Sequence, residues 1–278
     1  MSLTERLLNI DRRYIYLVIA VAVLVPFILP FHMPVYVSQP VRSVYDFIEA
    51  LPEGSVVLVG FNYSPSTMPE LYPMSLAVLK HCCSRKLKII GMTLYSSAAT
   101  IGDTALKEMA ESCSYQELQD YVYLGYKPNF EATMLGIGED IADPFPTDYM
   151  NRPVTEISMM KNIKNYRDIA LVIDLGSGNT PEAWIAYAGS RYGQKIASGC
   201  TGVMVSGLYP YLKAGQLVGL IGGLKGAAEY EKLVKLTGKA TLGMNAQSMA
   251  HLAIIFLVLL GNVVYLISRH KARKKVKV

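Results

Sequence analysis

The sequence predicts an α/β domain with a doubly wound, mainly parallel sheet and helices on both faces, joined to two transmembrane helices. Hydrophobic residues make up 51% of the 278 residues, which is more than a soluble domain usually contains. The excess lies in two long uncharged runs, one near each end of the chain. Between these runs, short β-rich segments alternate with longer helical ones, which is the pattern of parallel strands covered by helices.

Each of the two apolar runs is about long enough to cross the hydrocarbon of a bilayer, which takes roughly 20 helical residues. They cover residues 14–31 and 250–267 and contain no Asp, Glu, Lys or Arg. We therefore expect transmembrane helices at 14–32 and 249–268, with the α/β domain at 33–248 between them. A buried core helix is the alternative for either run. A cleaved signal peptide is the alternative for the first, although the bulky residues that follow it are unlike a cleavage site.

The cations beside both runs predict the orientation of the chain. Arg6, Arg12 and Arg13 precede the first run, and the second is followed by a basic tail without acidic residues. Lys and Arg beside a membrane span usually stay on the cytoplasmic side. Both end segments, 1–13 and 269–278, are therefore expected in the cytoplasm and the domain outside it, in a two-pass protein of the cell membrane. The tail is expected to contact anionic lipid headgroups through Arg269, Lys271, Arg273, Lys274, Lys275 and Lys277.

The net charge of +5 belongs to the chain ends and not to the domain. Residues 1–13 and 269–278 hold nine basic and two acidic residues, so the rest of the chain holds eighteen basic and twenty acidic ones. A protein that binds nucleic acid usually has a basic face on its folded domain. No such face is expected here, and no nucleic-acid partner.

The strands and helices of the domain follow from local patterns. Strands are expected at 55–61, 87–94, 120–124, 169–175 and 202–205, and helices at 68–85, 104–113 and 181–192. Because these strands are apolar on both faces, both sides of the sheet are expected to be buried. Thr67 with Glu70 has the form of a capping box, and Thr180 followed by Pro181 has that of a helix N-cap. The proline-rich segment 143–167 is expected to run over the surface or into a neighbouring molecule.

One helix is expected from 211 to 236, and its glycines form a regular pattern. Steps of four, three and four residues separate Gly215, Gly219, Gly222 and Gly226, so all four would share one stripe of the helix. Such a stripe predicts close packing of another backbone, either within the domain or between subunits. Gly223 lies off this stripe.

The second apolar run carries two strongly polar side chains, His251 and Asn262. They are eleven residues apart, close to three helical turns, and therefore lie on the same face of a helix. A polar face in lipid usually turns toward another helix, so we expect contact with the first span or with a second subunit. Membrane lipid, a second copy of the chain and other membrane proteins are the expected partners.

Small polar residues follow the predicted strands. In a sheet of this type ligands bind beyond the carboxyl ends of the strands, so these loops are the expected place for a ligand crevice. The candidate residues are Asn62, Ser64, Ser66, Ser96, Asp174, Ser177, Asn179 and Cys200. Turn structure alone also favours such residues in these places. No glycine-rich nucleotide motif and no nucleophile elbow occurs, and no cofactor is expected.

The sequence shows no defined catalytic or metal-binding group. The four histidines are not placed as a general base, and no spacing joins Ser96, Ser177 or Cys200 to Lys161 or Lys195. No histidine pair suggests a metal site. The four cysteines are Cys82, Cys83, Cys113 and Cys200; a bridge from Cys82 or Cys83 to Cys113 is allowed, and buried free thiols are the favoured prediction.

The segment from Ile169 to Val205 consists of a predicted strand, a loop of small residues, a helix and a Ser-Gly-Cys stretch. It resembles membrane-anchored serine peptidases of the signal-peptide-peptidase A kind, and the resemblance implies a hydrolase. It covers under a fifth of the chain, which lacks the paired-glycine oxyanion loop and an identifiable serine and lysine dyad. The sequence therefore predicts first a non-catalytic, membrane-anchored and homo-oligomeric scaffold or partner-binding protein. A serine or cysteine hydrolase and a receptor for a small polar ligand are the alternatives.

Overall fold

The computed structural model describes residues 10–29, 34–236 and 238–276, with side chains as far as residue 270. The chain divides into two compact units. One is Val35–Thr241, which is the α/β domain, and the other combines Met1–Pro34 with Leu242–Val278.

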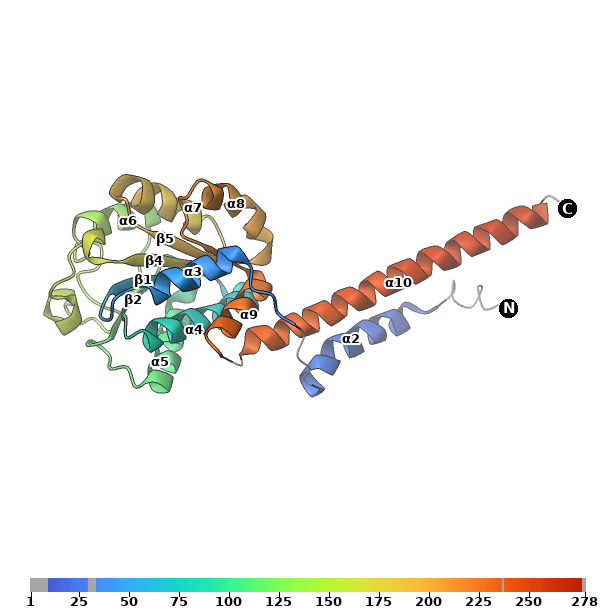
Figure 1. Cartoon of the computed structure of the whole chain (residues 1–278), viewed down its shortest axis with the longest axis horizontal. Coiled ribbons are helices and arrows are strands. Elements are labelled where there is room, and N and C mark those ends of the chain that lie inside the picture. Colours follow the sequence, from blue (N-terminus) through green and yellow to red (C-terminus); the bar gives the residue numbers. More distant parts are fainter. Residues whose placement is uncertain (1–9, 30–33, 237, 277–278) are drawn as a thin grey trace. The chain divides into compact units, whose positions relative to one another are not determined.

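The domain is built on one sheet of six parallel strands in the order β3-β2-β1-β4-β5-β6 (Figure 1). The strands are β1 (Val56–Asn62), β2 (Lys88–Thr93), β3 (Tyr121–Tyr126), β4 (Leu171–Gly176), β5 (Ile196–Cys200) and β6 (Leu220–Gly222). The predicted parallel α/β sheet is confirmed. The strand order is that of a doubly wound sheet, and it reverses direction between β1 and β4.

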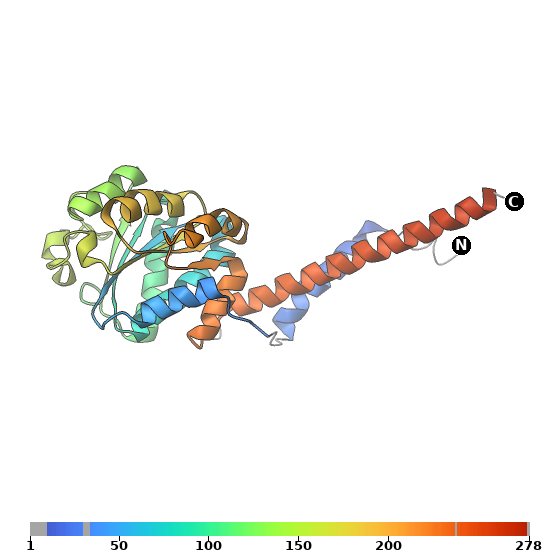
Figure 2. The same ribbon diagram turned by 45° about the horizontal axis from the view of Figure 1, so that its top comes forward.

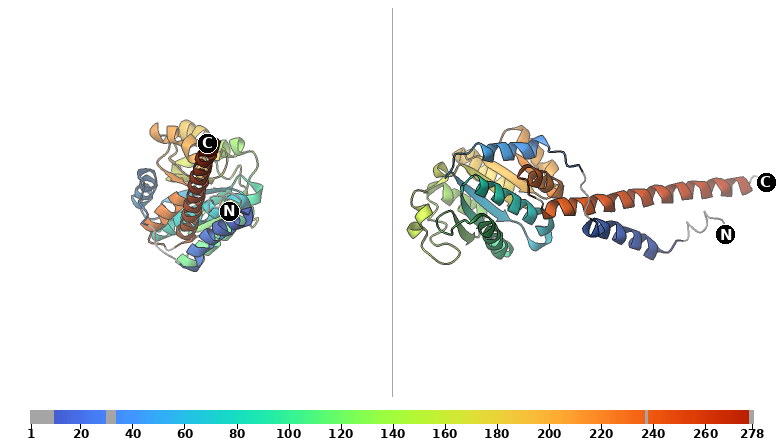
Figure 3. Two further views of the ribbon diagram at one scale, coloured as in Figure 1. Left: turned by 90° about the vertical axis from the view of Figure 1, so that its right-hand side faces the viewer. Right: turned by 60° about the horizontal axis from the view of Figure 1, so that its bottom comes forward.

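Helices lie on both sides of the sheet, as Figures 1 and 2 show from two directions and the right-hand view of Figure 3 from a third. The helices of the domain are α3 (Gln39–Glu49), α4 (Met68–Ser84), α5 (Ala99–Cys113), α6 (Phe130–Glu139), α7 (Thr180–Trp184), α8 (Val205–Lys213) and α9 (Gly223–Leu233). A π-helix, Ile185–Ser190, continues α7. One face of the sheet packs on α4 and α5, where Met74 lies against Gly199 and Leu106 against Gly91. The opposite face forms a core with α6, α7 and α8.

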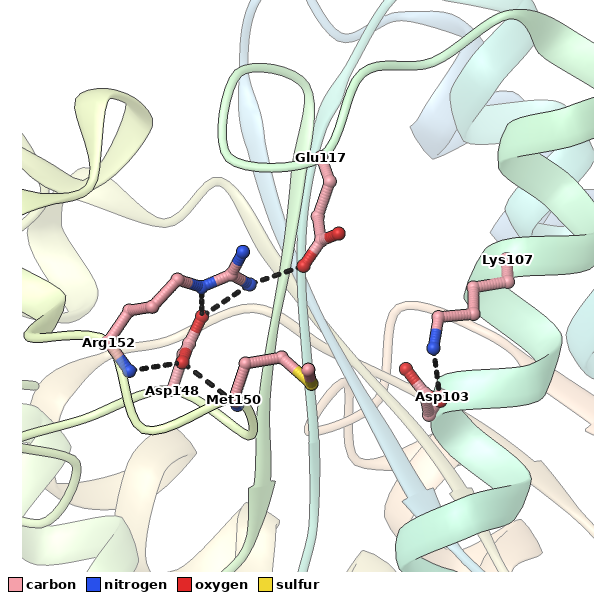
Figure 4. A network of polar contacts seen from close by, with 6 residues as sticks. All are labelled: Asp103, Lys107, Glu117, Asp148, Met150 and Arg152. Carbon is pink, nitrogen blue, oxygen red and sulfur yellow. Dashed lines mark hydrogen bonds and ion pairs between the residues drawn. The ribbon is translucent and has the colours of Figure 1, made fainter.

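The segment 143–167 is not the surface excursion that its prolines predicted. Its apolar side chains are buried in the core that α6 and α7 share, namely Phe145, Val154, Ile157, Met159, Met160, Ile163 and Tyr166. The buried carboxylate of Asp148 holds one of its turns by accepting hydrogen bonds from the Met150 amide at 2.9 Å and from the Arg152 amide at 2.8 Å. The Arg152 guanidinium also binds Asp148 and reaches Glu117, which precedes β3 (Figure 4). Buried apolar anchors and this ion network therefore tie the segment to the domain.

Two predicted elements near the end of the domain are wrong. The last strand is β5, and the predicted strand at 202–205 is a 3₁₀ turn, Gly202–Met204, that leads into α8. The predicted single helix at 211–236 is divided into the end of α8, a turn, the short strand β6 and α9. Parallel β-bridges to β5 hold β6 in the sheet, and this tertiary pairing overrides the local helical pattern.

The four glycines of the predicted stripe therefore do not share a helix face. Gly215 lies in the turn after α8 with φ of +72°, in the left-handed region. A side chain at Gly219 would place its Cβ atom 2.6 Å from the Pro40 carbonyl, and one at Gly222 would meet Val205 at 2.4 Å. Gly226 alone lies in α9, with Ile221 against it. Each glycine has its own packing or conformational cause within the domain.

The two predicted helix caps also differ from the structure. Thr67 makes no capping hydrogen bond, and its hydroxyl donates to the Ser64 carbonyl at 3.1 Å. Glu70 instead accepts from the Gly202 amide at 2.8 Å, so it joins α4 to the loop after β5. The N-cap of α7 is Asn179, and Thr180 is its first helical residue.

Outside the domain, α10 (Lys239–Val276) carries the predicted second span. Its portion Lys239–His270 is, among the described residues, the one helix long and apolar enough to cross a membrane. The predicted first span, 14–32, overlaps α2 (Arg12–Ile28), a helix of 17 residues with Pro26 inside it. Residues 30–32 of that span lie outside the described residues. One of the two predicted spans therefore has structural support.

The cysteines are divided between a cross-link and buried thiols. Cys83 in α4 and Cys113 at the end of α5 form a disulfide, with Cα atoms 6.4 Å apart. Cys82 and Cys200 are free and buried. The favoured prediction of free thiols throughout is thus wrong for one pair, and the alternative bridge to Cys113 is the one that forms.

Candidate functional site

The carboxyl ends of β1 and β4 meet at the point where the strand order reverses, and a buried polar cluster lies there. The Asp174 carboxylate is fully buried, and its Oδ1 accepts a hydrogen bond from Asn62 Nδ2 at 2.5 Å. Its Oδ2 accepts from the Thr180 hydroxyl at 2.9 Å. Asn62 Oδ1 in turn accepts from the Leu94 amide at 2.7 Å. These bonds connect the ends of β1, β2 and β4 with the start of α7.

Two glycines make room for this carboxylate. A Cβ atom at Gly60 would lie 2.7 Å from Asn62 Nδ2 and 3.4 Å from Asp174 Oδ1. A Cβ atom at Gly176 would lie 2.5 Å from the Thr180 hydroxyl and 2.7 Å from Asp174 Oδ2. Any larger residue at either position would displace the groups that bind Asp174.

Burial controls the protonation of Asp174. It raises the pKa of the carboxyl to about 7, because the charged form is poorly solvated in the interior. Asn62, Thr180 and the indole N–H of Trp184 favour the charged form and oppose this rise, while the charge of Glu182 adds to it. A carboxyl that titrates near neutral pH at the end of a parallel strand is a feature of functional sites.

Some polar side-chain atoms around this cluster are buried and have no hydrogen-bond partner among the described residues. They are Glu182 Oε2, Trp184 Nε1 and Ser198 Oγ. The Trp184 indole lies close enough to favour the Asp174 carboxylate but does not meet normal hydrogen-bond geometry. Ser198 is the register partner of Asp174 on β5, so both side chains lie on the same face of the sheet. The cluster thus offers donors and an acceptor that the chain itself leaves unused.

Five of the remaining predicted crevice residues lie in the loops that follow β1, β2 and β4, and we call these five residues the rim. Ser66, Ser96 and Asn179 are exposed, Ser64 and Ser177 are half-buried, and the hydroxyls of Ser64 and Ser66 lie 2.7 Å apart. The loops after β1, β2 and β4 supply them. Seven of the eight predicted residues therefore lie at or after the carboxyl ends of β1, β2 and β4: Asn62 and Asp174 are buried in the strands, and the five rim residues lie in the loops that follow.

Tyr95 lies between the loops of this rim. A Cβ atom at Gly178 would lie 2.1 Å from the Tyr95 hydroxyl, so the tyrosine side chain rests directly on the Gly178 backbone. Burial, with the nearby charge of Asp174, raises the pKa of Tyr95 above its usual value. The contact between Tyr95 and Gly178 therefore covers the loop that follows Asp174.

Cys200, the eighth predicted residue, is buried at the end of β5. Burial raises the pKa of its thiol to about 12, and the charges of Asp174, Glu70 and Glu182 add to the rise. The reactive form of a cysteine is the thiolate, so this thiol is suited to packing and not to nucleophilic attack.

Both lysines considered as bases follow contacts at the amino end of the sheet: Lys161 comes two residues after Met159, whose amide donates to the Leu118 carbonyl just before β3. Lys195 precedes β5 and its carbonyl accepts from the Val172 amide, at the amino end of the sheet, whereas Ser177 follows the carboxyl end of β4. His81 is buried elsewhere: its ring nitrogens bind Tyr230 at 2.8 Å and Glu49 at 2.9 Å, and Tyr45 stacks on it. These contacts join neither Lys195 nor His81 to a rim serine. Within the described residues, no three His, Cys, Asp or Glu side chains are grouped to hold a metal ion.

Tyr95, Thr180 and Ser198 lie in segments where the sequence predicts a ligand crevice, but they are not among its eight candidate residues, and Trp184 was not predicted at all. Ser198 would have followed from the alternation of strand side chains, had the strand been placed at Ile196–Cys200.

Comparisons with protein families, with curated proteins and with solved structures found no match to this chain.

Proposed function

We propose that the chain is a membrane-anchored binding protein whose α/β domain recognises a small polar ligand at the carboxyl ends of β1 and β4. The observation that carries this proposal is the buried Asp174 cluster at the strand ends, followed by loops whose hydroxyl and amide groups are exposed or half-buried. Doubly wound sheets bind ligands at the reversal of strand order, and this cluster lies at that point. We propose a binding function in preference to hydrolysis because Cys200 and the lysines are not arranged for nucleophilic attack.

Three features support a membrane location with the domain outside the cytoplasm. The apolar portion of α10 is long enough to span a bilayer, and we include a first span at 14–32 in the proposal. Basic residues flank both runs on the sides assigned to the cytoplasm, where the tail contacts lipid headgroups. The Cys83–Cys113 disulfide adds a third, since structural disulfides form mainly in oxidising compartments.

The topology predicts how the disulfide responds to reagents that cannot cross membranes. In intact cells, an impermeant reductant followed by an impermeant polyethylene glycol maleimide should shift the mobility of the chain on a gel. The Cys83→Ser, Cys113→Ser double variant should not shift, because Cys82 and Cys200 are buried. A Val278→Cys change in that background should react only after the cells are permeabilised. Labelling of Val278→Cys in sealed cells would overturn the topology.

The ligand site predicts selective stabilisation of the full chain in detergent. A panel of sugars, amino acids, carboxylic acids and nucleosides would be screened by thermal unfolding. A compound at about 100 times its Kd adds about 2.7 kcal/mol, which raises Tm by roughly 5–10 °C for a domain of this size. Asn179→Leu should abolish that rise, and Ser206→Leu, an exposed position on α8, should keep it. A rise of equal size in both variants would place binding elsewhere, and a panel without any stabilising compound would contradict the proposal.

Self-association through α10 is part of the proposal. His251 and Asn262 lie on one face of this helix, and the Asn262 amide donates to the Val258 carbonyl at 3.0 Å. The carbonyl oxygen of the Asn262 side chain remains an acceptor for a second helix. Light scattering of detergent-solubilised protein should give a mass above that of one chain, and His251→Leu with Asn262→Leu should lower it. A strictly monomeric wild-type protein would contradict self-association through α10.

A further inference from the structure

A separate pocket of about 350 Å³ lies at the carboxyl ends of β5 and β6. Residues of α3, α8 and α9 enclose it, and none of them belongs to the Asp174 cluster. Its polar wall consists of Ser38, Lys225 and Glu229, and Val41, Val205 and Leu220 contribute apolar surface. A volume of this size is within the range of small-molecule sites.

The polar wall presents a cation to the pocket. The Glu229 carboxylate is 1% exposed and accepts hydrogen bonds from the Ser38 amide at 2.8 Å and the Ser38 hydroxyl at 2.6 Å. Lys225 donates to the same carboxylate, yet its side chain is 70% exposed. An ammonium group has three donors, so two remain for a ligand oxygen.

The rim of the pocket carries exposed apolar side chains. Tyr209 lines the pocket and is 42% exposed. Val203, between the lining residues Gly202 and Val205, is 88% exposed, and Tyr36, two residues before Ser38, is 81% exposed. Tyrosine and aliphatic side chains beside a lysine are typical of surfaces that enter the interfacial layer of a membrane.

Residues of α9 that follow Glu229 hold both segments through which the chain leaves the domain. Glu231, two residues after Glu229 on α9, accepts hydrogen bonds from the amides of Ala240 and Thr241 at 2.9 Å and fixes the first turn of α10. Lys232 donates to the Val35 carbonyl at 2.6 Å. The first span proposed above ends six residues before Ser38, and six fully extended residues cover at most about 20 Å. Ser38 and Glu229 of the pocket are thus close in sequence to the two segments that connect the domain to the proposed spans.

We infer that this pocket binds the headgroup of a membrane phospholipid, with Lys225 donating to the phosphate and with Tyr36, Val203 and Tyr209 entering the interfacial layer. The inference rests on the membrane anchoring in the proposed function and does not depend on the ligand of the Asp174 cluster. It gives the domain a second, lipid-facing site.

The test uses the full chain in nanodiscs of phosphatidylcholine and phosphatidylglycerol, with and without lipids that carry a nitroxide on the headgroup. Wild type supplies the baseline, since its sole tryptophan, Trp184, is fully buried. In the Tyr209→Trp variant, the nitroxide lipid should quench at least about half of the fluorescence that the new tryptophan adds to that of wild type, because the new side chain lies in the interfacial layer. The Tyr126→Trp variant, at the end of the opposite edge strand β3, should lose little. Lys225→Gln should reduce the quenching of Tyr209→Trp, and Lys213→Gln at the end of α8 should not.

Each other outcome overturns the inference in a distinguishable way. A chain that inserts into nanodiscs but shows no selective quenching of Tyr209→Trp keeps its anchoring and loses the lipid site. Relief of the quenching by 10 mM inorganic phosphate with the disc intact would mean that the pocket takes free phosphate. Shielding of Tyr209→Trp that grows with the number of chains per disc would assign the surface to a second copy. A chain that fails to insert would overturn the anchoring and this site together.

Discussion

Asp174→Asn is expected to raise the free energy of unfolding at pH 8 by about 2–4 kcal/mol, because a carboxylate buried at a high energetic cost is replaced by a neutral amide. The folded pKa of about 7 lies above the unfolded value of about 3.9, so the folded protein binds this proton more tightly. The contribution of Asp174 to stability is therefore full below pH 4, declines as the pH rises to about 7 and stays low above it. The Thr180 hydroxyl can reverse its hydrogen bond to accept from the new amide.

Denaturant unfolding of the full chain between pH 4 and pH 8 measures this effect, and Trp184 supplies a local probe. Its indole N–H lies beside the Asp174 carboxylate, so its fluorescence should change with a midpoint near pH 7 in the wild type. That transition should be absent from Asp174→Asn and unchanged in Asp46→Asn, which alters an exposed carboxylate on α3. If the transition persists without Asp174, another group is titrating.

Trp184→Ala is expected to lower the free energy of unfolding by about 3–5 kcal/mol, the usual cost of removing a large buried aromatic side chain. Trp184 is fully buried and packs edge-on against Tyr166, with ring centroids 6.5 Å apart. Trp184→Phe keeps an aromatic ring in this space and should lose clearly less. Chemical denaturation followed by far-ultraviolet circular dichroism compares the variants without relying on tryptophan emission. Equal losses for Ala and Phe would mean that the indole N–H, and not packing, supplies the stability.

The strands that were predicted correctly share one property. Val56–Asn62 and Leu171–Gly176 each begin with consecutive β-branched or aliphatic residues, at 56–59 and 171–173, and such residues favour strands. In contrast, β5 consists of Ile-Ala-Ser-Gly-Cys, whose small residues have weak strand preference, and β6 has only three residues. Both exist because neighbouring strands pair with them, and local sequence does not reveal that pairing.

Gly223, which had no role in the predicted stripe, marks the error in the helix at 211–236. Its φ is +58°, and a Cβ atom there would lie 2.9 Å from the Gly202 Cα atom. This left-handed residue turns the chain from β6 into α9. The glycines at helical spacing are therefore present for separate structural reasons. Their spacing alone could not show whether they formed one packing stripe on a helix.

The candidate site was predictable in part. Asn62 and Asp174 follow from the rule that ligands bind beyond the carboxyl ends of parallel strands, since Asn62 ends β1 and Asp174 lies two residues before the end of β4. Trp184 and Thr180 required the structure, because their contact with Asp174 depends on how α7 packs on the sheet. The raised pKa likewise depends on burial, which comes from several segments together.

The cross-link between α4 and α5 has a practical consequence for anyone who makes this protein. A bridge across 30 residues contributes roughly 2–4 kcal/mol by restricting the unfolded chain. Synthesis in a reducing cytosol would withhold that contribution and leave neighbouring thiols at positions 82 and 83 to compete for the wrong partner during oxidation. Recombinant chain for the measurements above should therefore be exported by its host and purified without reductant.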